Sequence, residues 1–188
     1  MALDRREAVQ RLLADRGEML VVSGLGSPTY DVAAAGDDDR NFYLWGAMGS
    51  AAPIGLGLAL AQPSKRVLVV TGDGELLMGL GALASIAAQR PANLAIVVLD
   101  NERYGETGMQ KSHTAHGADL AAIAQGCGFP IVATITDESD LDRIVGEIRS
   151  GQGPMLVVVK ITAGEAPRVL PSRDGVDVKN RFRRSLGL

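Results

Sequence analysis

The sequence predicts an open, doubly wound α/β domain, in which a mostly parallel sheet has helices on both faces. Two features of the 188-residue chain predict this class. Short runs that are apolar at every position alternate with stretches of helical periodicity. Strands of this kind are buried on both faces, as in parallel sheets between two helix layers. A glycine or an aspartate follows several of the apolar runs and marks the end of each strand.

Five stretches are predicted to be helices because small or apolar residues recur in them at helical spacing. They are residues 6–17, 50–63, 75–90, 118–128 and 138–150. In the first helix, Val9, Leu12 and Leu13 share a face, and Gly17 marks the end. The third helix is expected to run unbroken from residue 75 to residue 90.

Six apolar runs beside these helices are predicted to be strands. They are residues 19–23, 41–45, 66–72, 94–100, 130–135 and 154–161. Because the alternation covers most of the chain, residues 1–188 are predicted to form a single domain. Residues 164–188 form a basic C-terminal extension, interpreted as a strip that is solvated or contacts a partner. A less favoured interpretation is that it helps to hold an anionic substrate group.

Composition and charge argue against several classes of protein. The net charge of −3 gives no reason to expect binding to nucleic acid. We expect no membrane span, because no uninterrupted apolar window is long enough, and no secretory segment, because the N-terminus is charged throughout. Cys127 is the only cysteine, which excludes an internal disulfide and a four-cysteine iron–sulfur cluster. We therefore expect a cytoplasmic protein.

Small or acidic residues end or directly follow four of the predicted strands, at Gly24, Gly46, Gly72 and Asp100. In open α/β sheets, ligands bind outside the carboxyl ends of the strands. All four residues are therefore expected to lie at one edge of the sheet, close to a common site.

Gly72-Asp73-Gly74 occupies a predicted strand-to-helix turn, and Asn101 closes the next strand. Free N–H groups at such a turn suit a phosphate, and a carboxylate beside a phosphate requires a divalent cation between them. Mg²⁺ takes about six oxygen ligands, typically one or two from protein side chains and the rest from phosphates and water. We predict that the Asp73 carboxylate, the Asn101 amide oxygen and the Arg103 carbonyl bind Mg²⁺.

The triplet Gly72-Asp73-Gly74, with Asn101 28 residues after Asp73, resembles the diphosphate-binding motif of thiamine-diphosphate enzymes. This family commonly has Asn-Asn where the chain has Asp100-Asn101, and the charge of Asp100 has no assigned role. The segment "WGAMG" at 45–49 resembles the G-x-M-G segment of the family. The resemblance implies that Met48 bends the cofactor from beneath and that the Gly46 carbonyl accepts a hydrogen bond from its aminopyrimidine.

The resemblance also implies further contacts to thiamine diphosphate. They involve Ser23 and Gly24 in the loop at 21–29, Gly72, Gly74 and Glu75 in the segment "GDGE", and Tyr104 and Gly105 after Asn101. His113 lies in the loop that follows and is a candidate proton shuttle or substrate contact. The alternative for His113 is a solvated loop histidine with no chemical role.

Two segments, "GDGELLMGLGALASIAA" and "LDNERYGETGMQ", resemble the diphosphate-binding chains of sulfopyruvate and phosphonopyruvate decarboxylases. The resemblance implies a thiamine-diphosphate-dependent carboxy-lyase that converts a small anionic 2-oxo acid into an aldehyde and CO2. Since the chain is one domain long, the resemblance also implies a separate pyrimidine-binding subunit that supplies the activating glutamate. The enzyme would then be a hetero-oligomer.

Two other functions stay open. A thiamine-diphosphate carboligase, similar to acetolactate synthase, would yield a hydroxyketone instead of an aldehyde. A noncatalytic phosphate- or nucleotide-binding module would show no preference for a thiamine moiety. Taken singly, the glycine-flanked Asp73 also suits a tight turn, Asn101 a strand cap and Met48 ordinary core packing. Their combination favours the cofactor site.

Overall fold

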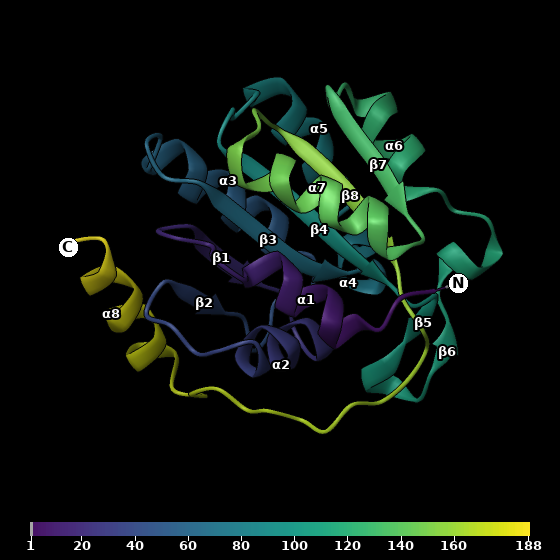
Figure 1. The fold of residues 1–188 in the computed structure, drawn as a ribbon, viewed down its shortest axis with the longest axis horizontal. Helices are drawn as coiled ribbons and strands as arrows, with labels where there is room; N and C mark the ends of the chain where they lie inside the picture. The colour runs from purple at the N-terminus through teal and green to yellow at the C-terminus, as the bar shows by residue number, and fades with distance from the viewer. Residues whose placement is uncertain (1) are drawn as a thin grey trace.

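A six-stranded parallel sheet forms the centre of the computed structural model, which describes residues 2–188 (Figure 1). The strands lie in the order β2-β1-β3-β4-β8-β7. Their bounds are Leu20–Ser23 for β1, Asn41–Tyr43 for β2, Val67–Gly72 for β3, Leu94–Asp100 for β4, Ile131–Ile135 for β7 and Met155–Lys160 for β8. Neighbouring strands pair in parallel throughout. The predicted fold class and all six predicted strands are confirmed.

Helices cover both faces of the sheet, and each face has its own apolar core. One core involves α1 (Arg5–Leu13), α2 (Ser27–Ala34) and α7 (Glu138–Ser150). The other involves α3 (Ala51–Ala61), α4 (Asp73–Met78), α5 (Ala82–Gln89) and α6 (Leu120–Cys127). From β1 the chain moves first to β2 on one side and then to β3 on the other, so the direction of winding reverses between β1 and β3. A reversal of this kind opens a crevice at the carboxyl ends of the strands, which is where ligands bind in such folds.

The predicted unbroken helix over 75–90 is wrong, because the structure divides it into α4 and α5 around Gly79–Gly81. The division follows from a close approach of two backbones. A Cβ on Gly79 would overlap the carbonyl group of Gly49, so the segment that carries Met48 packs directly on the end of α4. Apolar periodicity continues across the break, and for that reason the sequence pattern did not reveal it.

The predicted C-terminal extension lies against the domain and contains a helix, α8 (Gly175–Ser185), that packs beside β2. The Phe182 and Phe42 rings meet edge to face with their centroids 5.5 Å apart. Before α8, an extended segment crosses below α2 and β2 in the view of Figure 1, and the Trp45 indole donates a hydrogen bond of 2.7 Å to the Ser172 carbonyl. The extension is therefore anchored by apolar and polar contacts to its own domain.

Short irregular elements connect β4 to α6 near the carboxyl edge of the sheet. They are β5 (Arg103–Tyr104), the 3₁₀ helix η1 (Gly105–Thr107), β6 (Gln110–Lys111) and the 3₁₀ helix η2 (His113–His116). Strands β5 and β6 pair with each other in antiparallel fashion, apart from the main sheet. The segment therefore forms a loop beyond the carboxyl ends of β3 and β4, where the predicted site lies.

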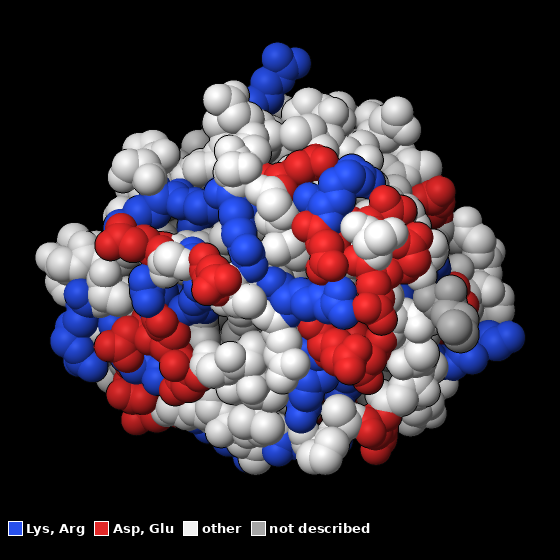
Figure 2. All heavy atoms as spheres, viewed as in Figure 1, with Lys and Arg blue, Asp and Glu red and all other residues white. Residues whose placement is uncertain are grey.

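The surface charges of the domain are mixed in sign. Figure 2 shows acidic and basic side chains interspersed over the face that carries α1, α2 and α7. Some of them form ion pairs between helices, such as Arg11 of α1 with Glu138 and Asp142 of α7. Within residues 2–188, every helix is too short or too polar to cross a membrane.

Candidate functional site

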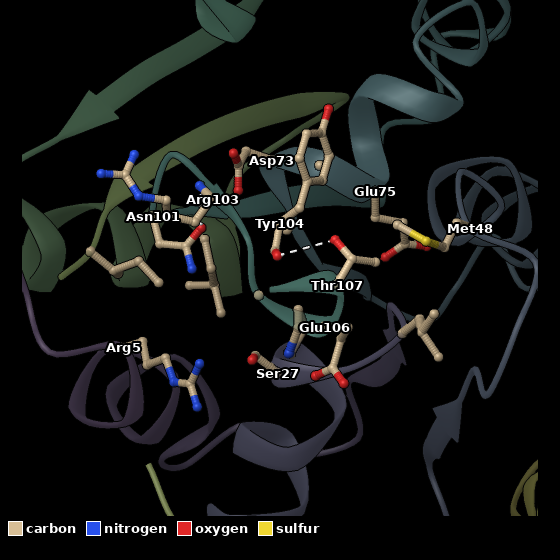
Figure 3. A pocket seen from close by; sticks show the side chains of 17 residues that line it. Arg5, Ser27, Met48, Asp73, Glu75, Asn101, Arg103, Tyr104, Glu106 and Thr107 are labelled. Carbon is tan, nitrogen blue, oxygen red and sulfur yellow. Dashed lines mark hydrogen bonds between the residues drawn. The ribbon is translucent and has the colours of Figure 1, made fainter. Parts of the chain in front are cut away.

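A pocket with about 660 Å³ of empty space, its open mouth included, lies at the carboxyl ends of β3 and β4 (Figure 3). It brings together many residues that the sequence predicted for the site: Met48, Gly72, Asp73, Gly74, Glu75, Asn101, Arg103, Tyr104 and Gly105. Asp73, Asn101 and Arg103 lie on one side of the view and Met48 on the other.

Asp73 is a buried carboxylate at the first residue of α4. Its Oδ2 atom accepts a hydrogen bond from the Ser112 hydroxyl and lies 3.2 Å from the Thr114 hydroxyl. Burial raises the pKa of Asp73, and the nearby carboxylate of Asp100 acts in the same direction. Neutral hydroxyls do not compensate a negative charge, so a cation bound at Asp73 would favour the ionised form of this carboxylate.

Asp100 forms an ion pair with Lys160 that the sequence did not reveal. Its Oδ2 atom lies 2.8 Å from the Lys160 ammonium on the neighbouring strand β8, and its Oδ1 atom accepts hydrogen bonds from the Thr114 hydroxyl and the Glu102 N–H group. The adjacent Asn101 accepts a hydrogen bond of 2.9 Å from the Arg103 N–H group through Oδ1. The ion pair thus anchors Asp100, and the tight turn after it holds Asn101 in the pocket wall.

Glu75 holds several loops of the site together. Its buried carboxylate accepts a hydrogen bond of 2.7 Å from the Thr71 hydroxyl and a longer one of 3.4 Å from the Ala51 N–H group. It also lies so close to Gly24 that a Cβ at that position would overlap it. Burial raises the pKa of Glu75, while the hydrogen bonds from Thr71 and from backbone N–H groups act in the opposite direction. The glycine at position 24 therefore makes room for a carboxylate of the protein itself.

Four residues predicted for the site lie outside the lining of this pocket, as far as residues 2–188 show: Ser23, Gly24, Gly46 and His113. The hydroxyls of Ser23 and Thr29 are buried 2.7 Å apart. His113 is exposed, and its Nδ1 atom lies 2.9 Å from the Tyr104 hydroxyl. The roles predicted for these four residues, like those of the residues that line the pocket, stay predictions.

The structure adds residues to the site that sequence reasoning missed, above all Ser112, Thr114 and Arg5. Ser112 and Thr114 stand on either side of His113 and turn inward, whereas His113 turns outward. The sequence signal that could have revealed Ser112 and Thr114 is a hydroxyl residue on each side of the predicted histidine. Arg5 lies far from every motif in the sequence, and only the path of α1 brings it to the pocket.

The donor set of the pocket suits a cation that is shared with phosphate. Within residues 2–188, His, Cys, Asp and Glu side chains do not form a group of three or more that could bind a metal. The pocket lining instead includes Asp73, Asn101 and Arg103, which carry a carboxylate, an amide and a main-chain carbonyl as oxygen donors. These are hard oxygen donors in the number from which Mg²⁺ is usually bound together with phosphate oxygens and water.

The fold and the pocket define a cofactor-binding α/β domain, and comparison with known proteins identifies its family. Residues 30–159 match the family described as thiamine pyrophosphate enzyme, C-terminal TPP binding domain. The chain therefore belongs to the thiamine pyrophosphate enzymes.

Within this family the chain is similar to decarboxylase chains. It is 38% identical over 182 residues to the sulfopyruvate decarboxylase subunit beta of Methanothermobacter thermautotrophicus, covering 97% of this chain and 95% of that one. It is 40% identical to the phosphonopyruvate decarboxylase of Streptomyces viridochromogenes, covering 95% of this chain but 45% of that protein. These matches confirm the predicted family and the predicted enzyme type, a thiamine-diphosphate-dependent decarboxylase subunit.

A solved structure shares the fold at low sequence identity. The benzoylformate decarboxylase of Polynucleobacter necessarius superposes with a TM-score of 0.76 at 20% identity, over 89% of this chain and 34% of that one. The likeness shows that this chain and part of that enzyme share a fold.

Proposed function

We propose that the chain is the diphosphate-binding subunit of a two-chain decarboxylase that uses thiamine diphosphate and Mg²⁺. Its substrate is a small anionic 2-oxo acid of the sulfopyruvate or phosphonopyruvate type, and its products are an aldehyde and CO2. The observation that carries the proposal is the pocket that joins Asp73, Asn101 and Met48 in a chain similar over nearly its whole length to a sulfopyruvate decarboxylase subunit beta.

The residues of the chain take distinct parts in binding. Asp73, Asn101 and the Arg103 carbonyl would hold Mg²⁺ together with the diphosphate, and the N–H groups around Gly72 and Gly74 would donate hydrogen bonds to phosphate oxygens. Met48 presents an apolar side chain to the ring portion of the cofactor. When bound, thiamine diphosphate supplies the electron sink that makes loss of CO2 from a 2-oxo acid possible. Glu75 and the pairing of Asp100 with Lys160 keep these groups in place.

A partner chain completes the proposed active site. The relative named subunit beta implies a second subunit, and we propose that it is a pyrimidine-binding chain that supplies the activating glutamate. Met48 in the pocket lining is 38% exposed, and Met78 on α4 is 63% exposed. Both apolar side chains are therefore accessible for contact with such a chain. We place the enzyme in the cytoplasm, since its single cysteine suits a reducing compartment.

The test combines the chain with a candidate pyrimidine-binding subunit and assays sulfopyruvate and phosphonopyruvate. We expect release of CO2 and an aldehyde that requires both chains, thiamine diphosphate and Mg²⁺. Asp73→Asn should abolish the reaction, because the amide lacks the charge that holds the cation. A hydroxyketone product would instead establish a carboligase, and nucleotide binding without a preference for thiamine diphosphate would establish a binding module.

A further inference from the structure

Arg5 places a buried cationic side chain at the wall of the cofactor pocket. It is the first residue of α1, and its side chain is 8% exposed. The backbone of Leu3 pairs with the segment after β8 through hydrogen bonds of 2.9 Å with Lys160 and Thr162. This pairing ties the N-terminus to the carboxyl edge of the sheet. The start of α1 therefore lies at the pocket.

The charge of Arg5 is only partly compensated by the protein. Its Nε atom lies 3.1 Å from Oδ2 of the fully buried Asp31, in an ion pair without hydrogen-bond alignment. Asp31 also pairs with Arg6 at 3.2 Å, so a single carboxylate serves two guanidinium groups. Among residues 2–188, no acceptor forms a hydrogen bond with the guanidinium of Arg5. Of its guanidinium nitrogens, Nε is the one that is fully buried without a hydrogen-bond partner, which is costly. An arginine carries five N–H donors, and those on the two terminal nitrogens can meet an acceptor in the pocket.

The guanidinium of Arg5 extends into the pocket on the side of Asn101, away from Met48, and Ser27 at the start of α2 lies beside it (Figure 3). Glu106 also lines the pocket, and its carboxylate lies 3.8 Å from the guanidinium of Arg168. The cation therefore lies on the side of the pocket where Asp73 and Asn101 are proposed to hold the diphosphate.

We propose that Arg5 binds the terminal phosphate of the cofactor through its guanidinium, and that Asp31 positions it for this contact. The inference rests on the proposed function, since it takes the diphosphate to lie between Gly72 and Asn101. Mg²⁺ neutralises only part of the charge of a diphosphate beside the Asp73 carboxylate. A guanidinium presents parallel N–H donors that match two oxygens of one phosphate, and so it adds both charge and orientation.

The test measures binding of thiamine diphosphate in the presence of Mg²⁺ to the full chain combined with its partner subunit. Fluorescence of Trp45, the only tryptophan, and calorimetry serve as readouts. We expect Arg5→Gln to raise the dissociation constant about tenfold or more, and Arg5→Lys to have a smaller effect. Arg6→Gln is the matched control, because it removes a guanidinium that pairs with the same Asp31 carboxylate but does not line the pocket. It should change the dissociation constant less than twofold.

Two further ligands locate the phosphate that Arg5 contacts. Inorganic diphosphate with Mg²⁺ should bind to the Arg5→Gln variant more weakly than to wild type. Thiamine monophosphate should bind to both with equal affinity. Equal binding of thiamine diphosphate by Arg5→Gln and Arg6→Gln would overturn the proposal. So would an unchanged dissociation constant combined with a raised KM for the 2-oxo acid, since the anion would then be that of the substrate.

Failure of this inference can be told apart from failure of the proposed function. If wild type binds thiamine diphosphate and Asp73→Asn does not, the diphosphate site stands whatever Arg5 does. If wild type in the complex shows no Mg²⁺-dependent binding of thiamine diphosphate, both the proposed diphosphate site and the proposed role of Arg5 are wrong. Thermal midpoints of the free variants show whether each one is folded.

Discussion

Asp73 at the carboxyl edge and Asp38 in the loop before β2 are held in opposite electrostatic surroundings. Asp73 is buried among hydroxyls, and burial raises its pKa. Asp38 pairs with Arg40 and Arg16, and hydrogen bonds from Arg40 hold its pKa well below the ordinary value. An acid paired with arginines of its own chain stabilises the fold, whereas an acid buried without such a partner has its charged form stabilised when an external cation binds.

The largest expected effect separates these two acids. Asp73→Asn should weaken binding of thiamine diphosphate with Mg²⁺ by about 100-fold or more, or about 2.7 kcal/mol. It should leave the unfolding free energy of the free chain unchanged or slightly higher, because folding disfavours the charge that the substitution removes. Calorimetric titration and denaturant unfolding measure the two quantities.

Asp38→Asn is the control for that comparison. It should lower the unfolding free energy by about 1 kcal/mol, a modest value because the pair is partly solvated. Binding of the cofactor should not change. A loss of stability in Asp73→Asn equal to that in Asp38→Asn would contradict the distinction between the two acids.

Glu75 sharpens the comparison, because it is buried like Asp73 but its partners are the Thr71 hydroxyl and the Ala51 N–H group. Glu75→Ala leaves these donors without an acceptor and should lower the unfolding free energy by about 1–3 kcal/mol. It should also weaken cofactor binding, since Ala51 belongs to the segment that carries Met48. Thermal unfolding and titration test both effects, with Glu75→Gln as the isosteric control. An alanine variant as stable as wild type would show that the carboxylate does not hold the loops.

The pH dependence of the unfolding free energy gives the smallest effect, about 1 kcal/mol on either limb. The lowered pKa of Asp38 contributes stability that is present above the unfolded value of about 3.9 and is lost as the pH falls below it. The raised pKa of Glu75 has the opposite sign: stability declines as the pH rises from about 4.3 towards the folded pKa of this group.

Denaturant unfolding of the free chain across pH 2–8 can resolve these two limbs. Asp38→Asn should reduce the slope of the acid limb. Glu75→Gln should reduce the decline above about pH 4.3, to which the raised pKa values of Asp73 and Asp31 also contribute. If each variant altered the limb assigned to the other, the assignment of the two pKa shifts would be wrong.

The outcome for particular residues shows where sequence reasoning succeeded. Asp73 and Asn101 were predicted to meet because both follow buried strands, and the parallel pairing of β3 with β4 places them at one edge. The interruption of the predicted helix at Gly79 was not expected. It follows from a backbone contact with Gly49, which lies 30 residues earlier in the sequence. Asp100 carried an unexplained charge until β8 brought Lys160 beside it.

The sequence by itself determined the class of fold, the family and the pair of polar strand ends, because these depend on local periodicity and on short motifs. Only the tertiary structure decided which distant residues complete the pocket. Arg5 comes from the first helix, Ser112 and Thr114 come from a loop, and each is placed by crossover connections and backbone pairing. Electrostatics at a buried site depends on such neighbours, and their distances are set by packing.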